Sequence, residues 1–544
     1  MQGRYAVVDL FAGPGGLAEG FSSFSSEDKL RPFKIALSVE KERPAHSTLL
    51  LRSFLRQFQN GYPQEYYDFL NHNNSEPEWR KIYPDQWAAA SSEAQLLTLG
   101  DVAASGFIDT RIGEIRDAHG DDTIVIGGPP CQAYSLVGRA RNTGIATYVA
   151  RDDPRHYLYK TYIDILSKLR PAAFVMENVK GMLSSSVDGV PIFGKVLEDL
   201  RSAAGADSYR LLALSPQRHA SGRLPLEPVP SDFILRAEDF GVPQSRHRVI
   251  ILGVRRDLAD RIDENRLCDA RLQPHERRAR VSDVLDGMPP LRSGLSRGQD
   301  SAVAWRAAFR TGVRAVLDSA FDLPPEQEQE LRAVLNGVLA HETAEQRGAS
   351  RPNGLGNGCP PSLANWLRDP RLAVLPNNET RGHMPSDLSR YLFASAFGKV
   401  TGRSPKAGEF PAALAPAHRN WETGKFSDRF RVQIADAPST TVTSHISKDG
   451  HYFIHPDPAQ CRSLTVREAA RLQTFPDNYY FKGNRTEQFV QVGNAVPPYL
   501  AMQIASRVHD LLVAAGQGTE HRGGCPEEIF YPPLVSQPRS KVSA

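Results

Sequence analysis

Short apolar runs alternate with amphipathic stretches over the first half of the chain. Between the runs lie a glycine-rich turn near residue 13 and a helical pattern near 158–169. Continuous apolar strands that alternate with helices predict a parallel, doubly wound α/β sheet. The runs with the length and β-branched content of buried strands are 5–11, 34–40, 123–126, 172–176 and 248–254.

Two later changes of pattern suggest further units. Residues from about 53 to 96 are rich in Tyr, Asn, Gln and Trp, which indicates an insertion in the first α/β unit, residues 1–255. Residues 256–436 are Arg-rich, then helical around 302–339, then rich in Gly and Pro, so we expect a second, smaller domain. Residues 437–515 return to helix-and-turn patterns, and residues 516–544 form a tail.

Composition supports a folded protein and says little about its partners. A chain of 544 residues with 40% hydrophobic and 23% charged residues suits two or three packed units rather than global disorder. The net charge of +3 is close to neutral. An Arg-rich stretch fits either a solvated helix or a phosphate-contacting surface; it comprises Arg255, Arg256, Arg261, Arg266, Arg271, Arg277, Arg278 and Arg280.

Cysteine usage and the absence of long apolar runs bear on the compartment. The five cysteines are scattered, with no CxxC and no Cys/His pair at zinc spacing. This predicts a reducing compartment, no disulfide framework and no metal. The N-terminus lacks a signal-peptide pattern, and no run approaches 18 apolar residues. We therefore expect a soluble, cytoplasmic protein.

The first two predicted strands end in residues suited to a nucleoside. Gly13 and Gly15, in the turn after the first strand, let the backbone approach a ligand at the start of a helix. Glu40 ends the second strand and can accept both ribose hydroxyls. Asp101, at the expected end of a third strand, can accept from an adenine amino group. The turn alone fits a ligand-free glycine cluster, and it is not GxGxxG, which disfavours a dinucleotide.

The next two strand ends carry a thiol and a carboxylate. Cys131 follows Pro129 and Pro130, which stiffen the turn and fix where the thiol points. A thiolate is a strong nucleophile near neutral pH, although a cysteine at a strand end is more often only packed. Glu177 ends the following strand and is expected beside Cys131. Its alternative role is that of a surface carboxylate capping a turn.

Two arginines open the last predicted strand. Arg246 and Arg248 alternate in the sequence QSRHR, so we expect both to point to one side. At the mouth of such a site an arginine binds an anion or a carbonyl. The alternative is an ion pair at the sheet edge.

Taken in order, these motifs resemble those of the cytosine-5 DNA methyltransferase family, bacterial type. The matching segments are DLFAGPGG, GGPPCQ, ENV, QSRHR, REAARLQTFP and QVGNAVPP, and the resemblance covers residues 1–255 and about 437–512. It implies a Rossmann-like methyltransferase domain that binds S-adenosylmethionine and a smaller target-recognition domain at 256–436. Residues 437–515 would then complete the cofactor pocket.

The resemblance also implies roles for individual residues. Cys131 would be the nucleophile that attacks carbon 6 of a flipped cytosine, Glu177 would bond N3, and Arg248 would reach O2, with Arg246 in support. The residues that correspond to cofactor contacts are Phe11, Glu40, Asp101, Pro130, Leu158 and Asn494. Two features depart from the family pattern: the insertion at 53–96 and Lys41, where some members place an aromatic residue.

The partner implied by the resemblance is double-stranded DNA, bound by a monomer. Companion restriction or phage-defence proteins are candidate partners, because no regulatory domain precedes the first motif. Methylation of RNA is the nearest alternative, but the large variable segment favours duplex DNA. A silent DNA-binding protein need not keep Cys131, Glu177 and Arg248 together. A small-molecule methyltransferase would leave the second domain unexplained.

Overall fold

The computed structural model describes most of the chain. Cys131, the predicted nucleophile, lies outside the described residues. The described ranges are 4–72, 74–130, 155–187, 190–216, 228–268, 270–296, 298–340, 343–348, 354–416 and 429–517.

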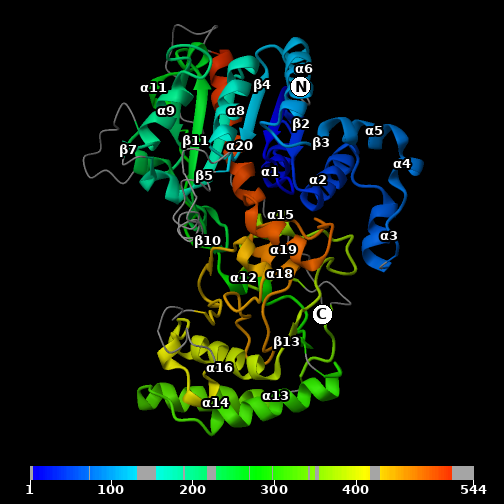
Figure 1. The fold of residues 1–544 in the computed structure, drawn as a ribbon, viewed down its shortest axis with the longest axis vertical. Helices are drawn as coiled ribbons and strands as arrows, with labels where there is room; N and C mark the ends of the chain where they lie inside the picture. The colour runs from blue at the N-terminus through cyan, green and yellow to red at the C-terminus, as the bar shows by residue number, and fades with distance from the viewer. Residues whose placement is uncertain are drawn as a thin grey trace, which may run out of the picture.

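An eight-stranded sheet forms the upper part of the molecule in Figure 1. Its order is β3-β2-β1-β4-β5-β11-β8, with β9 also paired to β11. All five predicted strands are present, whereas β3, β8 and β9 were not predicted as such. The strands are β1 (Tyr5–Leu10), β2 (Phe33–Glu40), β3 (Ala94–Leu96), β4 (Thr123–Gly127), β5 (Ala173–Val179), β8 (Tyr209–Ala213), β9 (Ile234–Arg236) and β11 (His247–Arg255).

The predicted parallel sheet is confirmed for strands β1 to β5, and one strand beside them runs the other way. Strands β1 to β5 pair in parallel, but β11 runs antiparallel to β5, β8 and β9. The chain passes from β5 to β8 and then turns back, so that β11 inserts between them. Such an antiparallel strand is common in otherwise parallel sheets.

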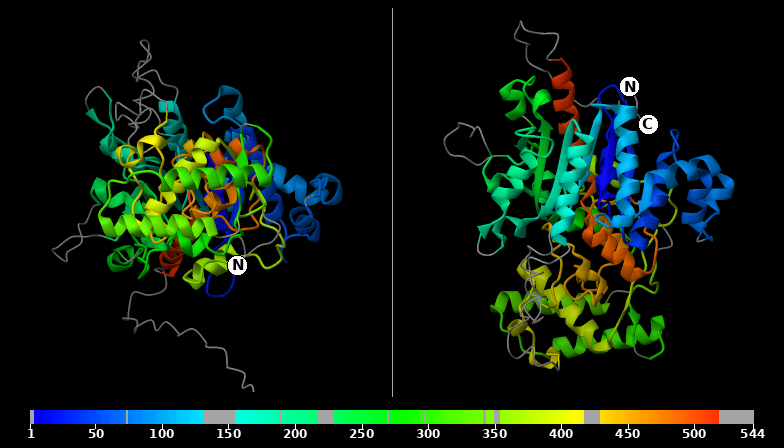
Figure 2. Two further views of the ribbon diagram at one scale, coloured as in Figure 1. Left: turned by 90° about the horizontal axis from the view of Figure 1, so that it is seen from below. Right: turned by 45° about the horizontal axis from the view of Figure 1, so that its top comes forward.

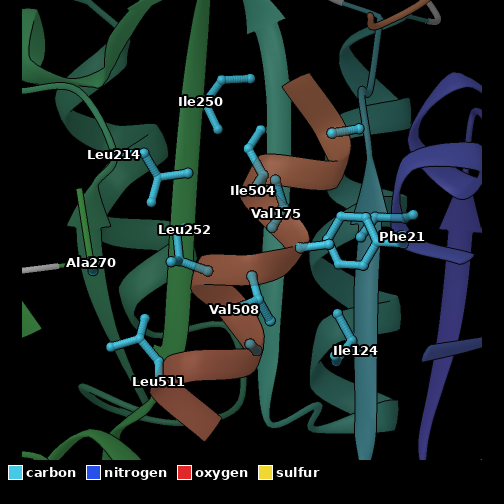
Figure 3. Packing of buried hydrophobic residues seen from close by; sticks show 14 of the residues in the cluster. Phe21, Ile124, Val175, Leu214, Ile250, Leu252, Ala270, Ile504, Val508 and Leu511 are labelled. Carbon is cyan, nitrogen blue, oxygen red and sulfur yellow. The ribbon is translucent and has the colours of Figure 1, made fainter. Parts of the chain in front are cut away.

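Helices cover both faces of the sheet. One face packs against α1 (Gly16–Ser23) and α20 (Pro498–Gln517), with α10 (Arg256–Ala259) and α11 (Glu264–Cys268) beside them. Figure 3 shows Ile504, Val508 and Leu511 of α20 lying against the strands that carry Val175 and Leu252. The other face packs against α6 (Val102–His119), α8 (Arg155–Leu169) and α9 (Phe193–Arg201).

The predicted insertion forms a helical arm beside the sheet (Figure 1). It follows α2 (Arg43–Arg56) and comprises α3 (Gln64–His72), α4 (Trp79–Ile82) and α5 (Pro84–Glu93). β3 comes directly after α5 and pairs with β2, so the arm spans residues 57–93. Its aromatic side chains, which the composition singled out, form a core with α2 that includes Phe54, Tyr66 and Trp79.

Two further cores lie below the sheet in Figure 1 and in the tilted view of Figure 2. The first joins α12 (Val281–Leu285) and α15 (Pro361–Leu367) to α18 (Val466–Leu472) and α19 (Arg485–Asn494). The second contains α13 (Ala302–Leu317), α14 (Pro325–Ala340) and α16 (Pro385–Thr401), together with Ile454 and Cys461. The last two residues follow the segment predicted as the second domain, so the two parts of the chain share one core.

Among the described residues, no helix combines the length and the apolar character that crossing a membrane requires.

The remaining strands and helices are short. The short strands are β6 (Ser186–Val187), β7 (Val190–Pro191), β10 (Gln244–Ser245), β12 (Gly294–Leu295), β13 (Gly382–His383) and β14 (Ser439–Thr440). The 3-10 helices are η2 (Lys180–Ser184), η3 (Pro230–Phe233), η4 (Ala237–Phe240), η5 (Ala407–Glu409), η6 (Ala412–Leu414) and η7 (Ser444–Ser447).

Candidate active site

The carboxyl ends of β1, β4 and β5 meet at one edge of the sheet. Gly127 is the register partner of both Leu10 and Met176. A Cβ at Gly127 would lie 2.4 Å from the carbonyl oxygen of Leu10, so the close approach of β1 and β4 requires glycine here. The turn that leads toward Cys131 therefore starts between the predicted cofactor loop and the strand that carries Glu177.

Glu177 and Arg248 form an ion pair at this edge. The Arg248 Nε lies 2.9 Å from Glu177 Oε1, and the two side chains are 16% and 15% exposed. Because β11 is antiparallel to β5, its first residues lie beside the last residues of β5, with Arg248 opposite Val179. A parallel β11 would have placed Arg248 at the opposite edge. The reversal of β11 is thus what brings the two predicted residues together.

The Pro-Pro turn is anchored to the end of β5. A Cβ at Gly128 would lie 3.0 Å from Glu177 Oε2, so the turn passes directly beside the carboxylate. The Asn178 side-chain amide donates to the Pro129 carbonyl oxygen at 2.9 Å. Pro130, the last described residue before Cys131, is thereby held close to Glu177. The anchoring role of Asn178 was missed from the sequence, although its position directly after Glu177 was a usable signal.

Arg246 and Arg248 have different contacts. The Arg246 side chain is buried, and its Nη1 donates to the carbonyl oxygens of Val442 at 2.9 Å and Gly493 at 3.4 Å. Burial lowers the pKa of Arg246 well below its usual value, as does the charge of Arg248, while Glu177 opposes the shift. Arg246 therefore joins the edge of the sheet to the returning chain and to α19.

The predicted cofactor loop is held by Glu40. Its carboxylate accepts from the backbone N–H groups of Gly13 at 2.8 Å, Lys41 at 2.9 Å and Glu42 at 2.7 Å. Burial raises the pKa of Glu40, and these backbone hydrogen bonds oppose the shift. Phe11 and Gly13 have positive φ angles of 58° and 59°. A Cβ at Gly13 would meet no described atom within 4 Å, so the described residues leave the loop backbone open at this point.

The remaining predicted cofactor residues come from other elements. The expected third-strand end at Asp101 is wrong: β3 ends at Leu96, and Asp101 is the exposed N-cap of α6. Leu158 of α8 lies nearby, since a Cβ at Gly100 would be 3.4 Å from its Cδ2. Asn494 is the exposed last residue of α19 and follows Gly493, the acceptor of Arg246. A glycine-rich loop with an open backbone and a carboxylate beside it fits a nucleoside-type ligand.

A buried amide pair joins the sheet edge to the lower cores. The Gln244 side chain donates to Gln473 Oε1 at 2.6 Å and accepts from the Val442 N–H at 2.8 Å. Gln473 in turn donates to the carbonyl oxygens of Val492 and Ala495, each at 2.8 Å. Close to this junction lies a hollow of about 380 Å³ lined by Arg431, Thr440, Thr441, Thr443, His445, Tyr452 and Phe453.

Comparison with known proteins identifies the family. The family model for the C-5 cytosine-specific DNA methylase matches residues 101–300 and 377–510. The type II methyltransferase M.Bpa9945I of Bacillus paralicheniformis is 33% identical over 532 residues, covering 93% of this chain and 99% of that relative. The type II methyltransferase M.AgeI of Thalassovita gelatinovora is 27% identical, covering 92% and 98%.

A third relative, the DNA (cytosine-5-)-methyltransferase M.ApeKI of Aeropyrum pernix, is 26% identical and covers 94% of this chain and 99% of its own. The family match spans more than half of the chain and includes the segments of Glu177, Arg248 and Asn494. The protein therefore belongs to the C-5 cytosine-specific DNA methylase family and is an enzyme of the DNA cytosine-5 methyltransferase class.

Proposed function

We propose that the protein transfers a methyl group from S-adenosylmethionine to carbon 5 of a cytosine in a specific sequence of double-stranded DNA. The observation that carries this proposal is the Glu177–Arg248 pair, with its 2.9 Å contact, beside the turn that leads to Cys131. A carboxyl group at the sheet edge can share a proton with a ring nitrogen of a pyrimidine. The guanidinium beside it can donate hydrogen bonds to the neighbouring carbonyl oxygen of the ring.

The proposed chemistry starts from the poor nucleophilicity of carbon 5. The Cys131 thiolate adds to carbon 6, and the ring electrons move toward N3 and O2. Glu177 shares or donates a proton at N3, while Arg248 at O2 stabilises the developing negative charge. The addition makes carbon 5 an electron-rich enamine carbon. S-adenosylmethionine, when bound, would supply the electrophilic methyl group that carbon 5 takes, with the sulfonium leaving as a neutral thioether. Loss of the carbon 5 proton to a base and elimination of Cys131 then restore the aromatic ring.

The residues that would hold S-adenosylmethionine include those of the glycine-rich loop. The open loop backbone at Gly13 and the carboxylate of Glu40 support this assignment. Phe11 would stack on the adenine, and Asp101 would accept from its amino group. The full proposed set is Phe11, Gly13, Gly15, Glu40, Asp101, Pro130, Leu158 and Asn494.

We infer that the target cytosine is flipped out of the duplex, because the reacting carbons are inaccessible in a stacked helix. Residues 256–436 would read base edges in the major groove, and Lys and Arg side chains would hold phosphates. The relatives named type II methyltransferases support a role in DNA modification, for which we infer a restriction or phage-defence protein as a candidate partner. We expect a monomer that acts in the cytoplasm.

The proposed thiol chemistry is tested by methyl transfer from tritiated S-adenosylmethionine to duplex DNA. Wild-type protein is expected to label DNA, Cys131→Ser is expected to be inactive, and Glu177→Gln is expected to lose about 10²- to 10⁴-fold in kcat. tRNA serves as a second substrate and should remain unlabelled. Equal labelling by wild type and Cys131→Ser would refute the thiol mechanism, and labelling of tRNA alone would refute the choice of DNA.

A covalent bond to carbon 6 has its own test. Duplex DNA that contains 5-fluorocytosine has no removable proton at carbon 5, so the bond to Cys131 should persist. Bisulfite sequencing of DNA from cells that express the protein identifies the sequence to use. A complex stable to denaturation is expected with wild type and not with Cys131→Ser. Its absence on the correct sequence would count against attack at carbon 6.

A further inference from the structure

A buried ion pair lies behind the cofactor loop. Arg52 of α2 pairs with Glu19 of α1, with 2.6 Å between Nη2 and Oε1, and the side chains are only 1% and 5% exposed. Arg52 also donates to the Tyr62 hydroxyl at 2.8 Å and to the Asn478 carbonyl oxygen at 3.3 Å. The guanidinium thus ties α1, which begins at the loop, to the helical arm and to the segment after α18.

Tyr479 connects this cluster to the loop itself. The Arg52 guanidinium carbon lies 4.3 Å from the centre of the Tyr479 ring, a cation–π arrangement. The Tyr479 hydroxyl is buried and donates to the carbonyl oxygen of Pro14. A Cβ at Gly15 would lie 3.2 Å from the same hydroxyl oxygen. The phenol therefore reaches the backbone between Gly13 and Gly15, the two glycines of the proposed cofactor loop.

The helical arm grips the segment that carries Tyr479. The Tyr66 hydroxyl donates to the Asn478 carbonyl oxygen at 2.6 Å. Lys482 forms an ion pair with Glu76 of the arm. With the Arg52 bond to Tyr62, the arm thus contacts this segment and its arginine at several points.

The arm also holds a second segment that supports Asn478. The Tyr67 hydroxyl and the Asn478 side-chain amide both donate to Asp369 Oδ2, each at 2.7 Å. The Arg371 guanidinium carbon lies 3.7 Å from the centre of the Tyr67 ring. Asn478, directly before Tyr479, is therefore held at its carbonyl oxygen by Tyr66 and at its side-chain amide by Asp369.

We propose that the helical arm, residues 57–93, positions the cofactor loop through the hydroxyl of Tyr479. Tyr479 is a positioning residue in this proposal, because it contacts the back of the loop and neither reacting group. The proposal rests on the proposed function in one respect, that this loop binds S-adenosylmethionine. The role of the arm is then to hold the loop in its binding conformation before the ligand arrives.

The alternative is that Tyr479 only fills a core. Its ring packs against Phe475 and Phe481, with centroid distances of 4.7 Å and 5.3 Å. Tyr479→Phe keeps this packing and removes only the hydroxyl. Tyr480→Phe is the matched control, since its half-buried ring packs on Phe69 of the arm at 5.0 Å. Tyr66→Phe removes one bond between the arm and the Tyr479 segment.

Two measurements separate the possibilities. Calorimetric titration with S-adenosylmethionine should give a Kd raised roughly 3- to 10-fold in Tyr479→Phe, as expected for one lost hydrogen bond. The Kd of Tyr66→Phe should rise by a smaller factor, and that of Tyr480→Phe should stay within about twofold. At saturating S-adenosylmethionine, kcat should remain unchanged, because the loss concerns binding. In ligand-free protein, amide exchange of residues 11–17 should accelerate in Tyr479→Phe and Tyr66→Phe but not in Tyr480→Phe.

Each result decides a separate point. If Tyr479→Phe matches Tyr480→Phe in both measurements, the positioning role is wrong. If Tyr479→Phe responds while Tyr66→Phe does not, the arm takes no part. If wild type does not bind S-adenosylmethionine, the proposed function fails, whereas amide exchange of the loop still tests the positioning role.

Discussion

Glu468 is the residue whose replacement should most clearly loosen the connection between the two lower cores. It lies in α18 and makes two hydrogen bonds with Arg462, Nη1 to Oε2 at 2.7 Å and Nη2 to Oε1 at 2.6 Å. The two side chains are 0% and 1% exposed. Glu468 also accepts from the Thr465 N–H at 2.7 Å and so caps the helix. Glu468→Gln removes the charge but keeps the shape.

The free-energy cost of Glu468→Gln follows from the burial of the Glu468–Arg462 pair. Burial alone would raise the pKa of Glu468, but the Arg462 guanidinium holds it at about 2, below its ordinary 4.5. The difference corresponds to about 3 kcal/mol. Removing one partner of a buried pair typically costs about 3–5 kcal/mol, because the other charge stays buried without compensation. We therefore expect Glu468→Gln to lower the opening free energy of this region by about 3 kcal/mol.

Native-state amide exchange of residues 463–475 measures this loss. An opening free energy lower by about 3 kcal/mol should speed exchange by roughly 100-fold. Glu487→Gln is the matched control: Glu487 accepts from the Asn484 N–H at 2.8 Å in the same capping arrangement on α19, outside the buried pair. That change should cost no more than about 1 kcal/mol. Equal effects of the two substitutions would refute the assignment of the energy to the ion pair.

The Glu468–Arg462 pair also predicts how the stability of this region changes with pH. The folded pKa of Glu468 is lowered, so its contribution is present above about pH 4.5 and is lost as the pH falls toward 2. His455 adds to the trend, since burial lowers its pKa to about 4 and the unfolded chain takes up its proton nearer 6.5. Wild-type exchange of residues 463–475 should therefore accelerate in acid after correction for intrinsic rates. A flat acid limb would contradict this reasoning.

Three other changes have expected outcomes. Gly16→Ala would place a Cβ 2.3 Å from the Val496 carbonyl oxygen and should lower Tm by several degrees in thermal unfolding, whereas Gly113→Ala, in open space on α6, should be neutral or stabilising. Asn178→Ala, which frees the Pro129 carbonyl, should lower kcat in the tritium assay about tenfold or more, with a much smaller effect on Tm. DNA affinity should fall steeply between about 50 and 200 mM salt in a filter-binding assay, and a flat response would contradict phosphate contacts.

The pattern of the sequence predicted the strands of the catalytic edge and the parallel direction of most of them, but not the reversed direction of β11. Apolar runs placed β1, β2, β4, β5 and β11 within one or two residues, except that β5 continues three residues further, because buried strands need continuous hydrophobic stretches. The same pattern fits either direction of β11, and the Glu177–Arg248 contact depends on the antiparallel one. β3 has only three residues, the last of them exposed, so it leaves almost no apolar signal.

The other contacts that the sequence did not predict join residues that are far apart in the chain. The composition identified the aromatic arm, but nothing local indicates that Tyr66 meets Asn478, 412 positions away. Tyr479 and Pro14 are likewise 465 positions apart. The roles of Phe11, Asp101, Leu158 and Asn494 remain predictions drawn from family resemblance, as does that of Cys131.

The place of α20 has a consequence for synthesis of the protein on the ribosome. This helix, Pro498–Gln517, covers the sheet face formed by β1, β4, β5 and β11, which is complete once residue 255 has been made. At about 5–20 residues per second, the roughly 240 residues between them take on the order of 10 to 50 s. The part of the apolar face that α20 covers stays exposed during that interval. Nascent chains should therefore engage chaperones, and chains that stop before α20 should aggregate.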